Sequence, residues 1–191
     1  MAGPIPINLA VEDALSEAIA RKILSQSGQL YEVGVCYNRG GAGYLKKMIK
    51  PFNHAAKGIP YFVLTDLDQV ECPPVLIADW LPNPRHHNLL FRVAVREVEA
   101  WVLAHRNAIA KFLSIREELI PQNVDEIIDP KQFLVNLARK SRNRNIRESI
   151  VPVPKSTAQV GRDYNGQMVY FVEKYWQLLE AKVHSPAYGG L

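Results

Sequence analysis

The chain of 191 residues is 48% hydrophobic and 22% charged, with a formal net charge of +4. This composition is typical of a globular protein and excludes disordered and fibrous classes, and the length allows one core with a small appendage. No apolar run approaches the roughly 20 residues of a membrane span, and the first residues lack a signal-type pattern. We therefore expect a soluble, cytoplasmic protein with no membrane partner.

Strands and helices alternate in the first part of the chain. A near-continuous apolar run at residues 6–11 predicts a strand buried on both faces, and a similar run at 60–66 predicts another strand. Further strands are predicted at residues 30–37 and 88–97. Helices are predicted between and after them, at residues 13–28, in a segment after the glycines near residue 40 that Pro51 stops or kinks, within 72–84 and at 98–113. The alternation indicates an α/β, Rossmann-like fold with a mostly parallel sheet flanked by helices.

The pattern changes beyond Leu113. Residues 129–142 predict one more helix, residues 149–166 are rich in proline and glycine, and residues 167–183 predict a last amphipathic helix. The sequence shows no repeats and no obvious linker. We therefore expect one compact domain, in which a helical and irregular C-terminal extension at 113–191 packs on an α/β core at 1–112.

Neither the cysteines nor a histidine pair predicts a metal site. Cys36 and Cys72 are far apart and lack the spacing of metal ligands, so two reduced thiols are expected. His86 and His87 fall in a turn rich in proline and asparagine, and we expect them on an exposed loop.

Carboxylates follow the predicted strands. Glu12 ends the first strand, and Asp66 and Asp68 end the third. Ligands of open α/β sheets bind at the carboxyl ends of the strands, and in an extended segment residues i and i+2 point the same way. The three acids therefore predict a site for a hard cation such as Mg²⁺, with Mn²⁺ as a substitute. A helix cap or an Asx-turn is the structural alternative for the aspartates.

Two further acids follow the fourth predicted strand. Glu97 and Glu99 share a face if the chain stays extended there, whereas in a helix only one of them faces the site. The alternative is a surface glutamate in the first turn of a helix, which the helix dipole favours. Arg96 is a candidate phosphate contact or a salt-bridge partner, and the sequence does not decide between these roles.

A glycine loop is the second candidate for chemistry. Glycines allow backbone amides to approach a phosphate closely, and a helix N-terminus adds positive potential. The pattern is neither GxGxxG nor a Walker A motif, so a plain glycine turn remains an alternative. The candidate phosphate-binding residues of this segment are Arg39, Gly40, Gly41, Gly43 and Lys46.

Basic residues are concentrated between positions 131 and 147, where Asp and Glu are absent until Glu148. Such a strip predicts contact with a phosphate backbone, and its binding would weaken steeply with salt. A solvated helix end is the alternative. The candidate nucleic-acid contacts are Lys131, Arg139, Lys140, Arg142, Arg144 and Arg147.

The order of these signals resembles the Toprim domain, the fold shared by topoisomerases, bacterial primases, recombination factors and OLD-family nucleases. The matching features are a strand ending in Glu, a glycine loop after the second strand and a strand ending in DxD. The stretches VREVEAWVLA (95–104) and VGRDYNGQMVYFVEKYW (160–176) further resemble a family of small, stand-alone Toprim-like bacterial proteins of the DUF4276 type. The resemblance covers most of the chain.

The resemblance implies Mg²⁺-dependent phosphoryl chemistry on DNA or RNA. Glu12 matches the Toprim glutamate, Asp66 and Asp68 match the DxD pair, and Glu97 or Glu99 matches the acid that helps to hold a second metal in OLD-type nucleases. Small Toprim proteins often act beside an ATPase in phage defence, so an ATPase partner is implied as well. A homodimer is also compatible with the chain.

The chain departs from the family pattern in two places. Asp13 follows Glu12, where the family commonly has glycine, and the position four residues beyond the glutamate is Ser16, with Glu17 one further on. The second departure puts a second metal site in doubt.

An active Mg²⁺-dependent endonuclease is the hypothesis that we favour from the sequence. The alternative is a catalytically degenerate Toprim-like subunit that docks on an ATPase or on nucleic acid. Hydrolysis of a nucleotide or another small phosphorylated substrate is a third hypothesis, which the short glycine loop permits.

Overall fold

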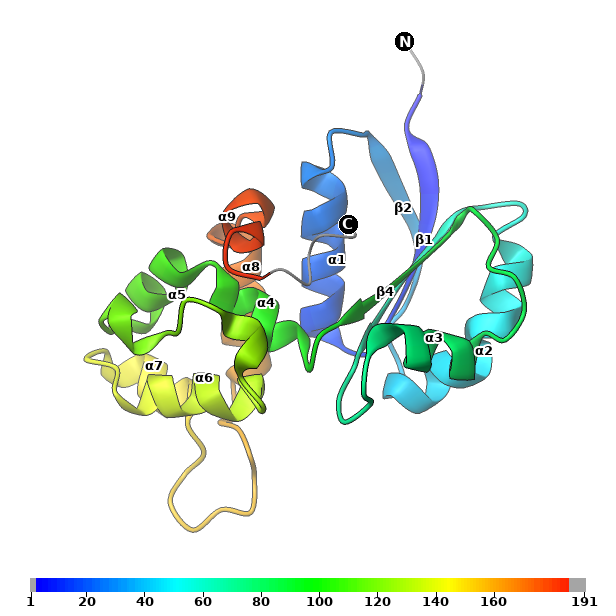
Figure 1. The fold of residues 1–191 in the computed structure, drawn as a ribbon. Helices are drawn as coiled ribbons and strands as arrows, with labels where there is room; N and C mark the ends of the chain where they lie inside the picture. Colours follow the sequence, from blue (N-terminus) through cyan, green and yellow to red (C-terminus); the bar gives the residue numbers. More distant parts are fainter. Residues whose placement is uncertain (1–2, 186–191) are drawn as a thin grey trace. The chain divides into compact units, whose positions relative to one another are not determined.

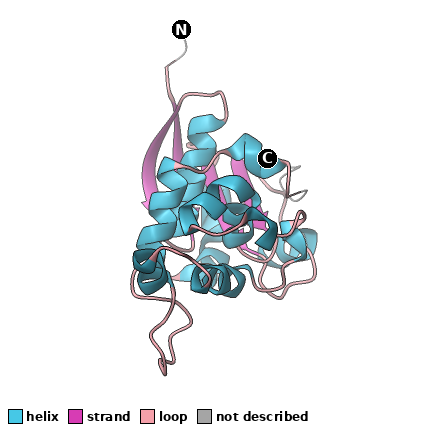
Figure 2. Ribbon diagram, turned by 90° about the vertical axis from the view of Figure 1, so that its left-hand side faces the viewer, coloured by secondary structure: helices cyan, strands magenta, loops and turns pink. Residues whose placement is uncertain are grey.

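The structure is a computed structural model that describes residues 3–185 (Figure 1). Contacts within the chain divide it into two compact units, Met1–Val95 and Arg96–Leu191. Among residues 3–185, all strands belong to the first unit, and every element of the second unit is a helix (Figure 2). The sequence-based division at residue 112 differs from this one, because it assigns residues 96–112 to the core of the sheet.

The first unit alternates strands and helices, as expected. Its strands form one four-stranded sheet that is parallel throughout, in the order β2-β1-β3-β4. The α/β prediction with a parallel sheet is therefore confirmed. The elements are β1 (Ile5–Val11), α1 (Ala14–Gln26), β2 (Tyr31–Tyr37), α2 (Gly41–Ala55), β3 (Tyr61–Asp66), α3 (Pro73–Trp80) and β4 (Leu89–Ala94).

The strand order reverses direction between β1 and β3. From β1 the chain passes through α1 to β2 on one side, and from β3 it passes through α3 to β4 on the other. The helices α2 and α3 pack together on one face of the sheet, whereas α1 covers the opposite face (Figure 1). In open α/β sheets, a crevice forms at such a switch point, outside the carboxyl ends of the two central strands.

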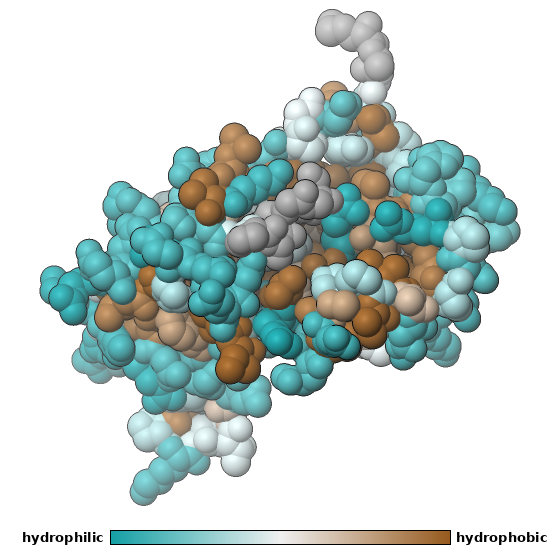
Figure 3. All heavy atoms as spheres, viewed as in Figure 1, coloured by the Kyte–Doolittle hydropathy of each residue, from teal (hydrophilic) through white to brown (hydrophobic). Residues whose placement is uncertain are grey.

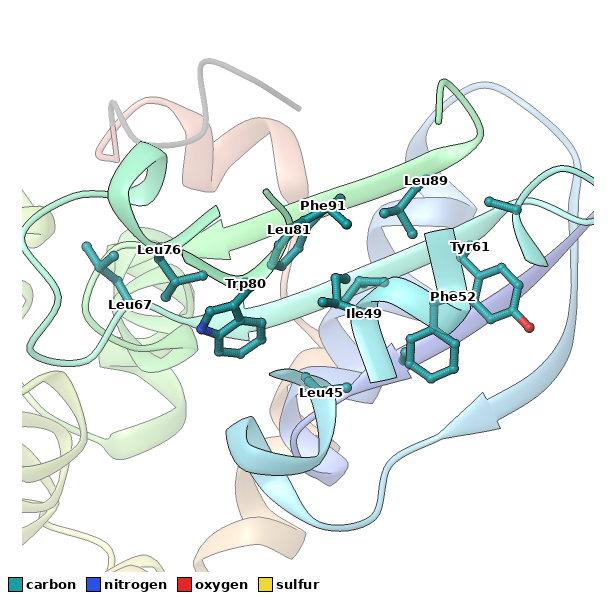
Figure 4. Close-up of a cluster of buried hydrophobic side chains, with 13 residues drawn as sticks. Leu45, Ile49, Phe52, Tyr61, Leu67, Leu76, Trp80, Leu81, Leu89 and Phe91 are labelled. Carbon is teal, nitrogen blue, oxygen red and sulfur yellow. The ribbon is translucent and has the colours of Figure 1, made fainter. Parts of the chain in front are cut away.

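Large apolar side chains fill the space between the sheet and the pair α2 and α3 (Figure 4). Phe52 of α2 stacks on Tyr61 of β3, and Trp80 of α3 lies against Phe91 of β4. All four side chains are at most 7% exposed. Burial of one such side chain stabilises the fold by about 1.5–3 kcal/mol, so this layer fixes the position of the strand ends.

An irregular register lies between β1 and β2. The pairing shifts between Ile7 and Leu9, and the side chain of the buried Asn8 accepts a hydrogen bond from Val35 N at 2.9 Å. A Cβ atom on Gly34 would lie 2.9 Å from Asn8 Oδ1. Glycine at position 34 therefore leaves room for the Asn8 side chain, which accepts the hydrogen bond of Val35 N where the register shifts.

Two details of the first unit differ from the sequence-based expectation. The helix α2 continues through Pro51 to Ala55, so the proline does not stop it. The strand β4 ends at Ala94 rather than at residue 97. Arg96, the first residue of the second unit, adopts a positive φ of 62°, which ends the extended conformation that follows β4.

In the part of the chain that the structure describes, the elements of the second unit are helices, and they are shorter than the helices that the sequence predicts. Its elements are α4 (Val98–Ala104), α5 (Arg106–Leu113), η1 (Glu117–Leu119), η2 (Val124–Glu126), α6 (Pro130–Arg139), α7 (Arg144–Ile150), α8 (Tyr164–Lys174) and α9 (Leu178–Lys182). In residues 3–185, no helix is long and apolar enough to cross a membrane.

Two predicted helices of this unit are interrupted, and the interruptions contact each other. The helix predicted at 98–113 breaks at His105, whose ψ of 64° is not helical, and the helix predicted at 167–183 breaks after Lys174. Trp176 Nε1 donates to the carbonyl of Trp101 at 2.8 Å, and Gln177 N donates to His105 Nδ1 at 3.1 Å. These bonds satisfy polar groups that the interruptions release.

Candidate functional site

Glu12 is the first residue after β1, and it is hydrogen-bonded to the end of β3. Its Oε1 accepts from Thr65 Oγ1 at 2.5 Å and from Asp66 N at 2.8 Å. The parallel register explains the contact, because Val11 pairs with Leu64 and the next residues of the two strands lie level. The pair Glu12 and Asp66 therefore lies at the switch point, where ligands of this architecture bind.

The two aspartates differ in backbone conformation. Asp66 is the last residue of β3 and is half-buried, whereas Asp68 is exposed and has a φ of +50°. Leu67 between them is buried, and its N–H donates to the carbonyl of Ala94 at 2.9 Å. The expectation that residues 66–68 remain extended is wrong, because Asp68 enters the left-handed region, which aspartate tolerates better than most residues.

The helix-cap alternative for the aspartates is also excluded. The next helix, α3, begins at Pro73, and its N-cap is Cys72. Within residues 3–185, no group of three or more His, Cys, Asp or Glu residues is placed so that it could hold a metal ion. A metal site formed by Glu12, Asp66 and Asp68 therefore stays a prediction. Its donor set is three carboxylates from adjacent strand ends, which fits Mg²⁺ or Mn²⁺ in chemical type.

The glycine loop is required by the turn into α2. Gly40 is the N-cap with a φ of +100°, and Gly41 follows with a φ of +61°. A Cβ atom on Gly40 would also lie 2.8 Å from Cβ of Tyr44. The backbone conformation therefore explains why glycine occupies positions 40 and 41, which agrees with the alternative of a plain glycine turn. Gly43 has no neighbour within 4 Å of an added Cβ, so the structure places no such demand on it.

The basic residues near this loop have different surroundings. Lys46 Nζ lies 2.6 Å from Asp79 Oδ2 of α3, and both side chains are more than half exposed. The negative partner of Lys46 is therefore Asp79, whereas the sequence predicted a phosphate in this role. Arg39 is exposed and lines a hollow of about 270 Å³ with Cys36, Tyr37, Asn38 and Tyr44. Arg39 is therefore the better placed of the two cations for an anion.

Glu17 connects α1 to the end of β2. Its Oε1 accepts from Arg21 Nε at 2.8 Å, and its Oε2 accepts from Asn38 Nδ2 at 2.5 Å. Burial acts to raise the pKa of Glu17, but hydrogen bonds from Arg21, Asn38 and Cys36 outweigh it, so the pKa is lowered. Ser16, at the position where OLD-type nucleases carry an acid, is buried, and its N–H donates to Asp13 Oδ1.

Cys36 beside Glu17 is a protonated thiol at neutral pH. Burial, followed by the charge of Glu17, raises its pKa to about 11. The thiolate is the reactive form of cysteine, so this position is unsuited to a nucleophile. The expectation of two unpaired cysteines is met at Cys36 and Cys72.

Glu97 and Glu99 belong to the second unit, where both contact Lys131. Glu97 precedes α4 in an extended conformation, and its Oε2 accepts from Lys131 N at 2.9 Å. Lys131 Nζ lies 3.5 Å from Glu97 Oε1 and 3.4 Å from Glu99 Oε1. None of the alternatives left open by the sequence describes this arrangement, in which two acids share one cation.

Glu99 is 1% exposed, so it is not a surface glutamate. Tyr164, the first residue of α8, donates its hydroxyl to Glu99 Oε1 at 3.0 Å. Glu99 Oε2 is also buried, and it has no hydrogen-bond partner among residues 3–185. Burial raises the pKa of Glu99 to about 7, although the charge of Lys131 acts in the opposite direction. The two stretches that resemble the Toprim-like family, EVEAW and GRDYN, thus meet at this buried pair.

Several side chains of the predicted basic strip already contact other groups of the protein. Lys131 is held by the two glutamates, Arg144 Nε lies 2.6 Å from Glu148 Oε1, and Arg147 Nη1 donates to the carbonyl of Ser141 at 2.5 Å. The side chains of Arg139, Lys140, Arg142 and Arg144 are exposed around the turn between α6 and α7. These four residues are the ones suited to contact phosphate groups.

Sequence reasoning missed the polar side chains that support the acids. Thr65 lies inside an apolar run, so the sequence predicts a β-branched core residue there. Asn38 lies before the glycines, so the sequence predicts a turn residue there. Their position at the carboxyl ends of β3 and β2 was the available signal.

Comparisons of the chain with known protein families, curated proteins and solved structures found no match. Membership of the Toprim-like family therefore stays a prediction, and the function is argued from the geometry of each unit.

Proposed function

We propose that the protein is a metal-dependent phosphodiesterase that cleaves DNA or RNA at the switch point of the first unit. The hydrogen-bonded pair of Glu12 and Asp66 carries this proposal. It joins the ends of the two central strands, β1 and β3, and places carboxylates where open α/β sheets bind their ligands.

Glu12, Asp66 and Asp68 would hold Mg²⁺ or Mn²⁺. The bound ion would supply Lewis-acid stabilisation of the phosphate and lower the pKa of an attacking water. Thr65 and Asp66 N fix Oε1 of Glu12 and leave the second carboxylate oxygen to face a ligand. Asp68, in its left-handed turn, presents an exposed carboxylate at the same strand end.

Hydrolysis adds a water oxygen to phosphorus while the bond from phosphorus to the leaving sugar oxygen breaks and that oxygen takes up a proton. Arg39, at the end of β2, would bind a phosphate oxygen and stabilise the charge that develops there. The exposed cations Arg139, Lys140, Arg142 and Arg144 would contact the backbone without reading sequence. Lys46, Arg96 and a second metal near Glu97 or Glu99 are not needed for this mechanism.

The resemblance to the Toprim-like family supports two extensions of the proposal. It adds an ATPase partner, and it adds a role in phage defence inside the cytoplasm. Both extensions concern the biological setting, so they are tested separately from the cleavage reaction.

A cleavage assay tests the chemistry. Purified protein is incubated with supercoiled plasmid and with single-stranded RNA in Mg²⁺ or Mn²⁺, beside the variants Glu12→Gln and Asp66→Asn. We expect cleavage by the wild type to fall by at least about 100-fold in both variants, since each removes a charged ligand. The control is Glu32→Gln, which neutralises an exposed acid at the amino end of β2 and should cleave normally. Equal activity in all four proteins would refute the proposal.

A binding subunit without catalysis is the second candidate function. One observation favours it: within residues 3–185 the acids do not form a ready group of three metal-ligating side chains. On this alternative, nucleic acid binds to the exposed cations with equal affinity in the wild type and in Asp66→Asn, and neither protein cleaves it with Mg²⁺ or Mn²⁺.

A further inference from the structure

The first unit has a second polar hollow at the opposite end of the sheet. It has a volume of about 550 Å³ and lies between the last turns of α2 and the loop that precedes β4. Asn88 of this loop is level with the start of β3, because Tyr61 N donates to its carbonyl at 3.0 Å. The hollow is thus at the amino ends of the strands, roughly 17 Å along β3 from the carboxylates at the other end.

Cationic side chains dominate this hollow. No Asp or Glu lines it within the described part of the chain, and residues 47–65 and 80–96 contain neither. Hydrophilic side chains cover this corner of the first unit in Figure 3, over α2 and the loop before β4. The side chains that carry or can carry positive charge are Lys50, His54, Lys57, Arg85, His86 and His87.

The loop that carries three of these side chains is held in place. Asn53 of α2 donates from Nδ2 to the carbonyl of Pro84 at 3.1 Å and accepts from His86 N at 2.8 Å. Asn88 Nδ2 donates to the carbonyl of Ala56 at 3.2 Å. Three hydrogen bonds therefore fix the loop on α2 and the turn after it, and Arg85 of the loop lines the same hollow as Lys50 and Lys57.

His86 is oriented as a hydrogen-bond donor. Its Nδ1 accepts from Asn88 N at 3.2 Å, which leaves Nε2 to carry the proton in the neutral ring. The ring centroid of His87 lies 4.2 Å away. Desolvation, followed by the charges of His87 and Lys57, lowers the pKa of His86. The positive groups of the hollow therefore repel one another when no anion is present.

Two other cations of the first unit have acidic neighbours, whereas the lining of this hollow contains no acid among the described residues. Elsewhere in the first unit, Lys46 pairs with Asp79 and Arg21 pairs with Glu17. Helix-dipole compensation explains a basic residue in the last turn of α2, but it does not explain the cations of the loop. An anionic ligand would relieve the repulsion and would accept hydrogen bonds from the fixed loop.

We propose that this hollow binds a ligand that carries two or more linked phosphate groups. One orthophosphate would neutralise only part of the charge of Lys50, Lys57 and Arg85 and fill only part of 550 Å³. Linked phosphates match both the charge and the size. Two sources share this chemistry, a free oligophosphate and the backbone of a nucleic acid, and the site does not depend on the cleavage proposed above.

Binding is measured by titration calorimetry of the full chain at low salt with three probes: tripolyphosphate, orthophosphate and a single-stranded oligonucleotide. We expect at least one linked-phosphate probe to bind about tenfold or more tightly than orthophosphate. The double variant Lys57→Gln and Arg85→Gln should weaken that binding about tenfold or more. Tripolyphosphate binding identifies a free oligophosphate as a sufficient ligand, whereas binding of the oligonucleotide alone identifies a nucleic-acid backbone.

The matched control is Lys174→Gln with Lys182→Gln. It removes the same charge from exposed positions of the second unit and should change the affinity less than about twofold. Equal affinity in the wild type and in the Lys57 and Arg85 double variant, or equal losses in both double variants, would overturn the proposal. The cleavage assay reports on Glu12 and Asp66, whereas the calorimetry reports on Lys57 and Arg85, so failure of the cleavage hypothesis and failure of this site are distinguishable.

Discussion

At the scale of single residues, the central contact of the first unit is between a carboxylate and a threonine hydroxyl. Thr65 is 1% exposed, and its hydroxyl donates to Glu12 at 2.5 Å. A buried donor of this kind orients an acidic side chain without contacting the ligand itself. Partners that orient metal ligands commonly change affinity or activity by about 10–100-fold when they are replaced.

Replacement of Thr65 by valine tests this orienting role. Thr65→Val keeps the branched shape and removes the donor, so we expect cleavage and Mn²⁺ affinity to fall by about 10–100-fold. The stability of the fold should fall by only about 1 kcal/mol in urea unfolding. Thr65→Ser restores the hydroxyl and should recover most of the lost activity. A fully active valine variant would show that Thr65 has only a packing role.

Single residues were also the scale at which the sequence was least informative. The position of Glu12 at a strand end could be predicted from an apolar run that stops at an acid. The left-handed turn at Asp68 and the pairing of Lys131 with Glu97 could not, because they depend on groups from other segments. Hydrophobic periodicity carries no information about such partners.

At the scale of elements, the strands were predicted well where an apolar run is buried, as in β1 and β3. Residues 60–66 and β3 agree almost fully for this reason. The strand β2 was also predicted, although none of its residues is fully buried. The helices of the second unit were predicted too long, since amphipathic spacing continues through His105 and Tyr175 although the backbone does not. The interruptions are stabilised by tertiary hydrogen bonds, which override local propensity.

The shifted register between β1 and β2 provides a test at this scale. Gly34→Ala would place a Cβ atom 2.9 Å from Asn8 Oδ1, which must then move away from Val35 N. We expect a loss of about 1–3 kcal/mol in the free energy of unfolding, measured in urea. Gly43→Ala is the control, because its Cβ meets no atom within 4 Å in a helix, and it should be neutral or stabilising by up to about 1 kcal/mol.

At the scale of the whole molecule, the two units carry different kinds of acid. The acids of the first unit follow strand ends at the switch point, whereas Glu99 of the second unit is enclosed with Tyr164 and Lys131. A buried carboxylate such as Glu99 affects stability, because its ionisation lowers the free energy of unfolding when its pKa is higher in the folded chain than in the unfolded chain. Glu99 should therefore contribute to the pH dependence of unfolding.

The direction of this dependence follows from the pKa of Glu99. Burial raises it from the usual 4.5 to about 7, so the folded chain holds the proton more tightly than the unfolded chain. The corresponding stability is fully present below pH 4.5 and is lost as the pH rises toward 7. The loss should be roughly 1–3 kcal/mol, measured by urea unfolding between pH 4 and about 8.

Glu99→Gln should remove this slope, because glutamine does not titrate and still accepts from Tyr164. At pH values above about 7 the variant should be more stable than the wild type, whereas near pH 4.5 the two should be similar. Glu118→Gln, at an exposed position of the same unit, serves as the control and should keep the wild-type slope. A slope that survives in Glu99→Gln would locate the titrating group elsewhere.

The paired interruptions of the second unit have a consequence for how this chain tolerates changes in length. Trp176 donates to the carbonyl of Trp101, and Gln177 N donates to His105 Nδ1, so two hydrogen bonds join residues that are 75 and 72 positions apart in the sequence. Inserting one amino acid at either interruption would rotate the following helix by about 100° and misalign both contacts at once. A compensating insertion in the opposite segment would not restore the match, because the indole and the imidazole must meet particular backbone atoms. The spacing between these turns is therefore expected to be as intolerant of insertions as the interior of a helix.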